Sequence, residues 1–130
     1  MKIFITPLIA FVFALTTAFT PNINPMDDVV DALKKGNVTT IATYFDDMVE
    51  IALPDKSDSY NKSQAAVVLK DFFTNNPVKN FVVEHKGNNG GSEFCIGTLQ
   101  TQKNNYRLTV YLKQKGALVT LQEIRIEQKK

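Results

Sequence analysis

The chain has 130 residues, with 15 basic and 13 acidic side chains and a hydrophobic content of 44%. This length fits one domain with a modest core. A single cysteine and a single histidine exclude an internal disulfide and the usual zinc sites, so we expect no metal and no cofactor.

The first 18 residues have the layout of a secretory signal peptide. Lys2 precedes an apolar run over residues 3–15, and small residues follow, so we expect cleavage after Ala18. The run is shorter than the roughly 20 residues that a membrane-spanning helix needs. We therefore predict an exported protein, periplasmic or secreted, with residues 19–25 as an N-terminal extension and no integral membrane segment after cleavage. An uncleaved N-terminal anchor is the alternative.

Two helices are predicted at the start of the mature chain. The stretch PNINPMDD (21–28) combines a proline with an acidic first turn, and Val29, Val30 and Leu33 then fall on one helical face. Gly36 ends this helix. The stretch VTTIATYF (38–45) has apolar residues at helical spacing and predicts a second, short helix.

One strand and a longer helix are predicted next. MVEIAL (48–53) alternates between two faces and stops at Pro54, which predicts a strand. The polar DKSDS (55–59) is interpreted as a solvated turn, because the glycine and glutamate of a calcium loop are absent. In NKSQAAVVLKDFFTNN (61–76), Asn61 and Gln64 have the spacing of a capping box and a wide apolar stripe follows.

After Pro77 the sequence alternates with a period of two, which predicts four antiparallel strands. In the first run, Phe81, Val83 and His85 share one face, which we expect to be the interior one. In the last run the apolar parity changes without a turn, which predicts a β-bulge near Gln122 and Glu123.

The glycine-rich stretch GNNGG (87–91) lies between two of these strands. A phosphate-binding loop would need glycines that open a helix, with a lysine and a hydroxyl at fixed spacing. The stretch instead leads into Phe94 and Ile96, so we predict a hairpin loop whose glycines accept positive φ. Cys95 is then an unpaired strand residue that is buried or half-buried.

The order of elements is helix, helix, strand, helix and four strands (ααβαββββ). We predict a single α+β domain over residues 26–128, in which a strongly bent antiparallel sheet forms a cone and the N-terminal helices pack on its concave face.

This order of elements is similar to the nuclear transport factor 2-like superfamily, which also includes ketosteroid isomerase and SnoaL-like proteins. The blocks YNKSQAAVVLKDFF, HKGNNGGSEFCIGTLQT, YRLTVYLK and LQEIRIE resemble a bacterial group of small exported members without an assigned function. The resemblance covers roughly residues 26 to 127 and implies a conical pocket between the sheet and the long helix. It also implies that dimerisation through the outer face of the sheet is a common mode of association.

Candidate site residues are few. An isomerase needs a carboxylate base in its pocket with neutral acids opposite, and the inward strand positions are apolar instead. His85 is the candidate catalytic residue, as a general base, although no neighbouring acid orients it. The candidate ligand-binding residues are Tyr44, Phe72, His85 and Tyr106.

The distribution of charge along the chain limits the classes of partner that we expect. The sequence is acidic up to residue 102 and basic from Lys103 onward, with Arg107 and Lys113 on one strand face and Arg125 adjoining it. This pattern is typical of a solvated face, and we expect no nucleic acid. We predict non-catalytic binding of a small apolar ligand or a protein partner, through the cone pocket or the sheet face, with a homodimer as one form. The alternatives are a pocket enzyme of isomerase or hydrolase type that uses His85, and a structural component of an envelope assembly.

Overall fold

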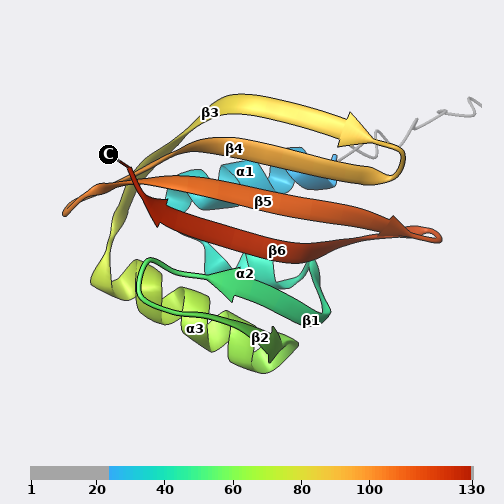
Figure 1. Ribbon diagram of the computed structural model, residues 1–130, viewed down its shortest axis with the longest axis horizontal. Helices are drawn as coiled ribbons and strands as arrows, with labels where there is room; N and C mark the ends of the chain where they lie inside the picture. The colour runs from blue at the N-terminus through green and yellow to red at the C-terminus, as the bar shows by residue number, and fades with distance from the viewer. Residues whose placement is uncertain (1–23, 130) are drawn as a thin grey trace, which may run out of the picture.

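In the computed structural model, which describes residues 24–129, three helices lie on one side of a six-stranded sheet (Figure 1). The helices are α1 (Pro25–Lys35), α2 (Val38–Ala42) and α3 (Lys62–Asn75). The strands are β1 (Phe45–Ala52), β2 (Ser57–Asn61), β3 (Val78–Asn89), β4 (Ser92–Thr101), β5 (Asn105–Lys115) and β6 (Leu118–Gln128). The predicted signal peptide lies outside the described residues. No helix within residues 24–129 is long and apolar enough to cross a membrane.

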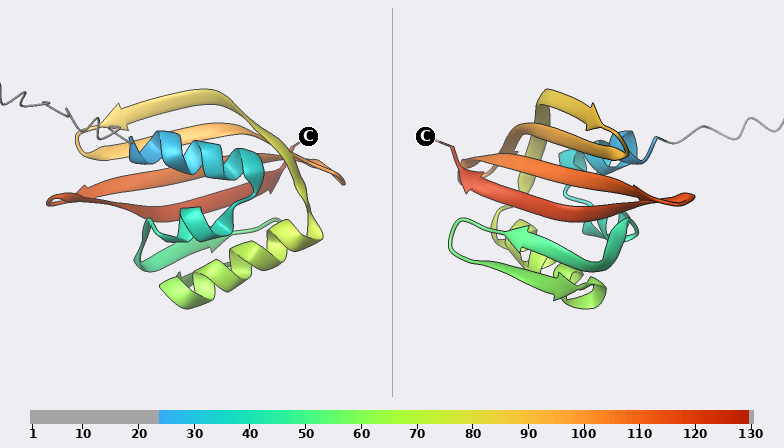
Figure 2. Two further views of the ribbon diagram at one scale, coloured as in Figure 1. Left: turned by 180° about the vertical axis from the view of Figure 1, so that it is seen from behind. Right: turned by 45° about the vertical axis from the view of Figure 1, so that its right-hand side comes forward.

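The sheet is curved and open, with the strand order β2-β1-β6-β5-β4-β3. Strands β3 to β6 form the predicted antiparallel meander, and β1 joins β6 in parallel. Figure 2 shows α1 on the concave side of the sheet, where it contacts β3 and β4, whereas α3 lies beside β1 and β2. The predicted α+β architecture is therefore confirmed.

Strand β2 is an addition to the predicted order. The prediction of a solvated turn at 55–59 is wrong for its last part, because Ser57 to Asn61 pair with β1. Nearly all side chains of this strand are exposed, so it has no apolar alternation by which the sequence could reveal it. Its conformation follows from backbone pairing with β1 at the edge of the sheet.

Helix ends follow the local chemistry of the sequence. The side chain of Asn24 accepts a hydrogen bond from Met26 N, and Gly36 closes α1 with a φ of 65°. Asn61 caps α3 in the same way, by accepting from the backbone N of Gln64 at 2.9 Å. Asn24 and Asn61 thus each satisfy a backbone N–H that the first turn of the helix leaves free.

Irregularities in the pairing of β3 and of β6 turn side chains from one face of the sheet to the other. In β6 the register shifts between Glu123 and Leu121, so Gln122 is the extra residue and the predicted bulge is confirmed. In β3 the register shifts between Val83 and His85, which makes Glu84 an extra residue that the sequence did not reveal.

The core fills the concave side of the sheet. Most inward-facing side chains of the strands are buried against the three helices, together with the helical side chains that meet them. They include Leu33, Ile41, Phe81, Leu99, Leu108, Val110, Ile124 and Ile126. Cys95 belongs to this core, and burial raises the pKa of its thiol.

Candidate functional site

The structure brings together two of the four predicted ligand residues. Phe72, on the last turns of α3, and Tyr106, at the start of β5, meet edge to face with their ring centroids 5.3 Å apart. They border a hollow of about 250 Å³ whose rim is largely polar, formed by α3, the connection between β1 and β2, and the ends of β5 and β6. This volume is below the range of about 300–1,000 Å³ that is usual for ligand pockets.

The hydroxyl of Tyr106 is already engaged. It donates to Oδ1 of Asn76 at 3.0 Å, and the Asn76 amide donates in turn to the carbonyl of Phe72 at 3.0 Å. Tyr106 is only 5% exposed. The pair therefore joins the C-terminal end of α3 to the sheet, and Phe72 supplies the aromatic surface that the hollow presents.

Tyr44 lies elsewhere, between α2 and β1. Its hydroxyl donates to Oδ2 of Asp28, on the first turn of α1, at 2.6 Å. Burial, with further contributions from this hydrogen bond and from the charge of Asp28, raises the pKa of the Tyr44 phenol to about 12. In this structure Tyr44 links the turn before β1 to α1 and does not border the hollow beside Phe72.

His85 is not on the interior face, and the prediction of its orientation is wrong. The bulge at Glu84 turns His85 to the outer face of the sheet, where the residue is exposed and its ring lies 5.8 Å from that of Phe94. Lys86 is turned the opposite way and contacts Asp27 of α1 at 3.3 Å. The sheet therefore separates His85 from the concave side, where a general base of the cone pocket would have to lie.

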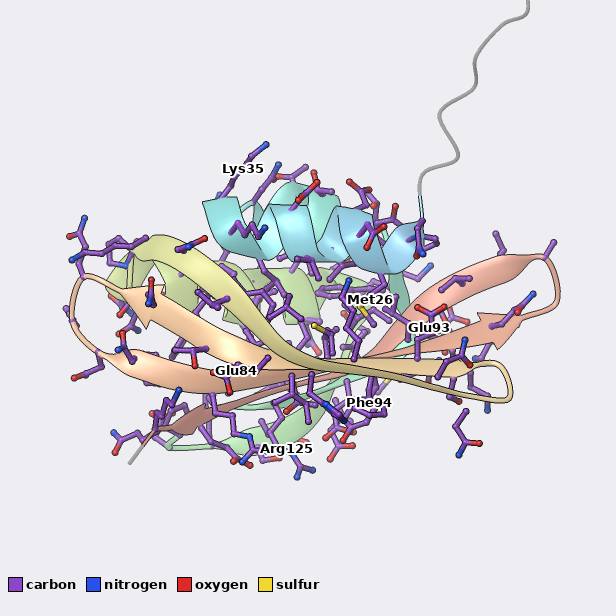
Figure 3. All side chains as sticks on the ribbon, turned by 90° about the horizontal axis from the view of Figure 1, so that it is seen from above. Met26, Lys35, Glu84, Glu93, Phe94 and Arg125 are labelled. Atoms are coloured by element: carbon purple, nitrogen blue, oxygen red, sulfur yellow. The ribbon has the colours of Figure 1, made fainter. Side chains whose placement is uncertain are left out.

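The outer face of the sheet carries an apolar area that the sequence analysis did not single out. We call this area the outer-face patch, and its members are Val82, His85, Phe94, Ile96 and Tyr111. Val82 is 43% exposed and Tyr111 is 38% exposed, although both are large apolar side chains. Figure 3 shows Phe94 on the side of the sheet away from the helices.

The ring of Phe94 is the centre of this patch. It lies between His85 and Tyr111, with a centroid distance of 6.4 Å to the tyrosine ring. On the neighbouring strand it covers Gly87, where any Cβ would collide with the ring. The alternation of β4 could have revealed the patch, because Phe94 and Ile96 are apolar although the opposite face of the same strand is the buried one.

Charged side chains of both signs surround the patch. Lys129 donates to Thr98 at 2.6 Å and to Glu84 at 3.2 Å, and the Thr98 hydroxyl also donates to Glu84. These hydrogen bonds lower the pKa of the Glu84 carboxyl. Arg107, Lys113 and Arg125 do share this face as the sequence predicts.

Acidic residues alternate with these basic ones. Arg125 pairs with Glu123 at 2.9 Å, and Arg107 lies opposite Glu127 in the register of β5 and β6. The outer face is therefore mixed in charge and not uniformly basic. Within residues 24–129, no three His, Cys, Asp or Glu side chains come close enough together to hold a metal ion.

The comparisons with known proteins agree with this fold. A crystal structure of a DUF4783 family protein from Bacteroides ovatus is 32% identical, with a TM-score of 0.76, and the match covers 79% of this chain and 94% of that one. A second, from Bacteroides uniformis, is 30% identical with a TM-score of 0.79 and covers 82% and 99% of the two chains. A nuclear transport factor 2-like protein of unknown function from Cytophaga hutchinsonii shares the fold, with 10% identity, a TM-score of 0.59 and coverage of 85% and 94%.

The search of curated proteins gives no match. The profile described as a domain of unknown function, DUF4783, matches residues 26–127. This match spans most of the chain, and the chain therefore belongs to the DUF4783 family, with a nuclear transport factor 2-like fold.

Proposed function

We propose that this chain is an exported, non-catalytic binding module, and that its binding surface is the outer face of the sheet. The observation that carries the proposal is the outer-face patch, where Val82 and Tyr111 are exposed on the face of the sheet away from the helices. Aromatic side chains surrounded by polar groups are typical of the centre of a protein interface. Export rests on the signal-peptide pattern of residues 1–18.

A second copy of the same chain is the partner that this face fits best. In a two-fold dimer the same surface is used twice, so it has to be complementary to itself. A face with an apolar centre and charges of both signs around it meets that requirement, since Arg107 and Arg125 of one copy can meet Glu84 or Glu127 of the other. A face that carried charges of only one sign would be repelled by the same face of a second copy.

The pocket-enzyme alternative loses its geometric support. A general base has to lie within hydrogen-bond reach of the proton that it removes from a bound substrate. His85 lies on the outer face, on the opposite side of the sheet from Phe81 and the other inward side chains. The hollow that Phe72 and Tyr106 border does not include His85.

A small ligand in the hollow beside Phe72 is the second candidate. The exposed surface of Phe72 and the amides of Asn75 and Asn76 would give such a ligand one stacking contact and several hydrogen bonds. This function uses a different part of the molecule from the outer-face patch.

Native mass spectrometry of the protein purified from its own host separates these possibilities. The proposal predicts the mass of two chains that begin near residue 19, without an added small molecule. A monomer that carries a bound small molecule would support the hollow beside Phe72 and contradict the proposal. A monomer with nothing bound would also contradict it, and a complex with a different protein would overturn the assignment of the partner.

A further inference from the structure

Helix α3 is apolar on two sides, although the described chain covers only one of them. Ala65, Leu69 and Phe73 face the core and are buried. On the other side Val67 is 68% exposed, the highest fraction among large apolar residues of the helices. A helix with apolar side chains around most of its circumference is usually covered around most of it.

The exposed side of α3 forms one wall of a groove of about 560 Å³. The opposite wall is α2 with the turn that precedes it, and the small side chains of Ala42 and Ala66 leave the space between the two helices. Val38 and Phe73, which are both buried, form apolar walls deeper in the groove. The volume lies within the range of about 300–1,000 Å³ for sites that bind small molecules.

The charge of the groove selects the kind of ligand. Lys70 is the single charged side chain among the residues that line it, and no carboxylate does so. Lys70 forms no ion pair with any described residue, and neither do Lys34 and Lys35 at the end of α1, next to the groove residue Gly36. A second hollow on the far side of Val67 includes Asp58 and lacks this one-sided charge.

From these observations we propose that the groove between α2 and α3 binds a single-chain amphiphile with a carboxylate head, such as a free fatty acid. The chain lies against Val38, Ala42 and Ala66, and the carboxylate meets Lys70 at the rim. An apolar wall with one convergent cation is the usual composition of a site for an acyl carboxylate. The site is on the helical side of the molecule, so it does not depend on whether the outer-face patch binds a second copy.

Decanoate is a suitable probe, with decyltrimethylammonium as a ligand of equal chain length and opposite charge. NMR titration of the chain without residues 1–18 should give saturable shifts at Val38, Ala66 and Lys70 below the micelle concentration of decanoate. Ala66→Phe fills the groove and should weaken decanoate binding at least about tenfold, because a site filled by a side chain cannot hold the acyl chain. Lys70→Glu should weaken it by about fivefold and strengthen binding of decyltrimethylammonium.

Two further variants make the result interpretable. Lys79→Glu makes the same charge change at an exposed position of β3 and should leave the affinity unchanged. Val67→Asp places a negative charge at the rim of the groove and should weaken decanoate binding. Because Val67 is exposed, this variant should fold, and it tests the groove independently of Ala66→Phe.

Four results would overturn the proposal. The first is the absence of saturable decanoate binding, and the second is an affinity that Lys70→Glu and Val67→Asp leave unchanged. The third is a set of shifts that lie on the outer face of the sheet. A change in oligomeric mass caused by Val67→Asp would assign the groove to a second copy instead.

Discussion

Tyr44 illustrates how a side chain that resembles a ligand contact in the sequence can be used for structure. Its phenol donates to the carboxylate of Asp28, which lies 16 residues earlier, on α1. The hydrogen bond holds the start of β1 against α1. A hydroxyl engaged in this way is less available to a ligand, because a ligand would have to replace a charged acceptor.

Tyr44→Phe should lower the free energy of unfolding at pH 7 by about 1.5 kcal/mol, the usual value for a hydrogen bond to a charged group. The folded-state pKa of this phenol is raised from 10.0 to about 12, so the associated stability is present below pH 10 and is lost as the pH rises toward 12. A titration followed by tyrosinate absorbance should contain one step near pH 12 that the variant lacks. If the step that disappears in Tyr44→Phe has its midpoint near the ordinary pKa of 10.0, this assignment is contradicted.

Two glycines of the sheet should respond differently to alanine. A Cβ at Gly97 would collide with the carbonyl of Val82 and lie 2.7 Å from the ring of Phe81, and neither group can move without disturbing β3. A Cβ at Gly87 would collide only with the outer end of the Phe94 ring, which can turn away toward solvent.

Gly97→Ala should therefore lower the free energy of unfolding by about 2–3 kcal/mol, and Gly87→Ala by less than about 1 kcal/mol. Urea denaturation of the two variants measures the difference. Equal losses of unfolding free energy would contradict the distinction between the backbone contact at Gly97 and the side-chain contact at Gly87.

The predictable part of the sheet depended on where the apolar residues fall. The bulge in β6 was predictable because Leu121 and Ile124 are both apolar and differ in parity. The bulge in β3 was not, because the polar Glu84 is the extra residue and His85 is compatible with either face. Counting alternate residues from Phe81 therefore predicted that His85 faces the interior, whereas the pairing of β3 with β4 puts it on the outer face of the sheet.

At the scale of secondary-structure elements, Asp46 connects three strands. It lies on β1 and accepts hydrogen bonds from Lys115 at the end of β5, at 2.5 Å, and from Gln122 at the bulge of β6. The hydrogen bond from Lys115, with that from the backbone of Asp47, lowers the pKa of the Asp46 carboxyl to about 2. The ionised side chain thus holds the bulge at a fixed position beside β1.

Asp46→Asn should lower the free energy of unfolding above pH 4 by about 1 kcal/mol or less. A depressed folded-state pKa stabilises the protein above the ordinary value of 3.8, and this stability is lost as the pH falls from about 4 to 2. The difference in unfolding free energy between wild type and variant should therefore shrink over that range. Asp47→Asn, at an exposed neighbour with a longer 3.6 Å ion pair to Lys62, is the matched control. A difference that stays constant between pH 6 and pH 2 would contradict this role.

The elements that the sequence predicted well are those with a buried face and a local cap. Helices α1 and α3 have both, and their ends were predicted to within a residue or two. Strand β2 has neither, and it forms because β1 offers an unpaired edge. The predicted strand began at Met48, whereas the pairing of Phe45 with Leu121 extends β1 across Asp46 and Asp47.

The two sides of the sheet differ in the side chains that they carry. The concave side is filled with side chains that are fully buried, among them Phe81, Leu108 and Ile124. The outer side has a patch of exposed apolar residues within a mixed ring of charges. The fold was predictable from the sequence, and the sheet face was among the expected binding surfaces. His85 was not assigned to the outer-face patch, because the face on which a strand residue lies depends on the bulges.

The outer-face patch, as proposed above, holds two copies of this chain together. Tyr111→Arg would place a charge at the centre of that contact, and Leu118→Arg makes the same change at a residue that is 69% exposed at the tip of the β5–β6 hairpin. Burying an unpaired charge in an interface costs more than about 1.4 kcal/mol, which corresponds to a tenfold change in the dissociation constant.

Sedimentation velocity over a range of concentrations is the most direct test. Wild type and Leu118→Arg should sediment as dimers with the same dissociation constant, and Tyr111→Arg should dissociate at concentrations at least tenfold higher. A wild-type protein that remains monomeric at every concentration, or a Tyr111→Arg variant that dimerises as tightly as Leu118→Arg, would contradict the claim.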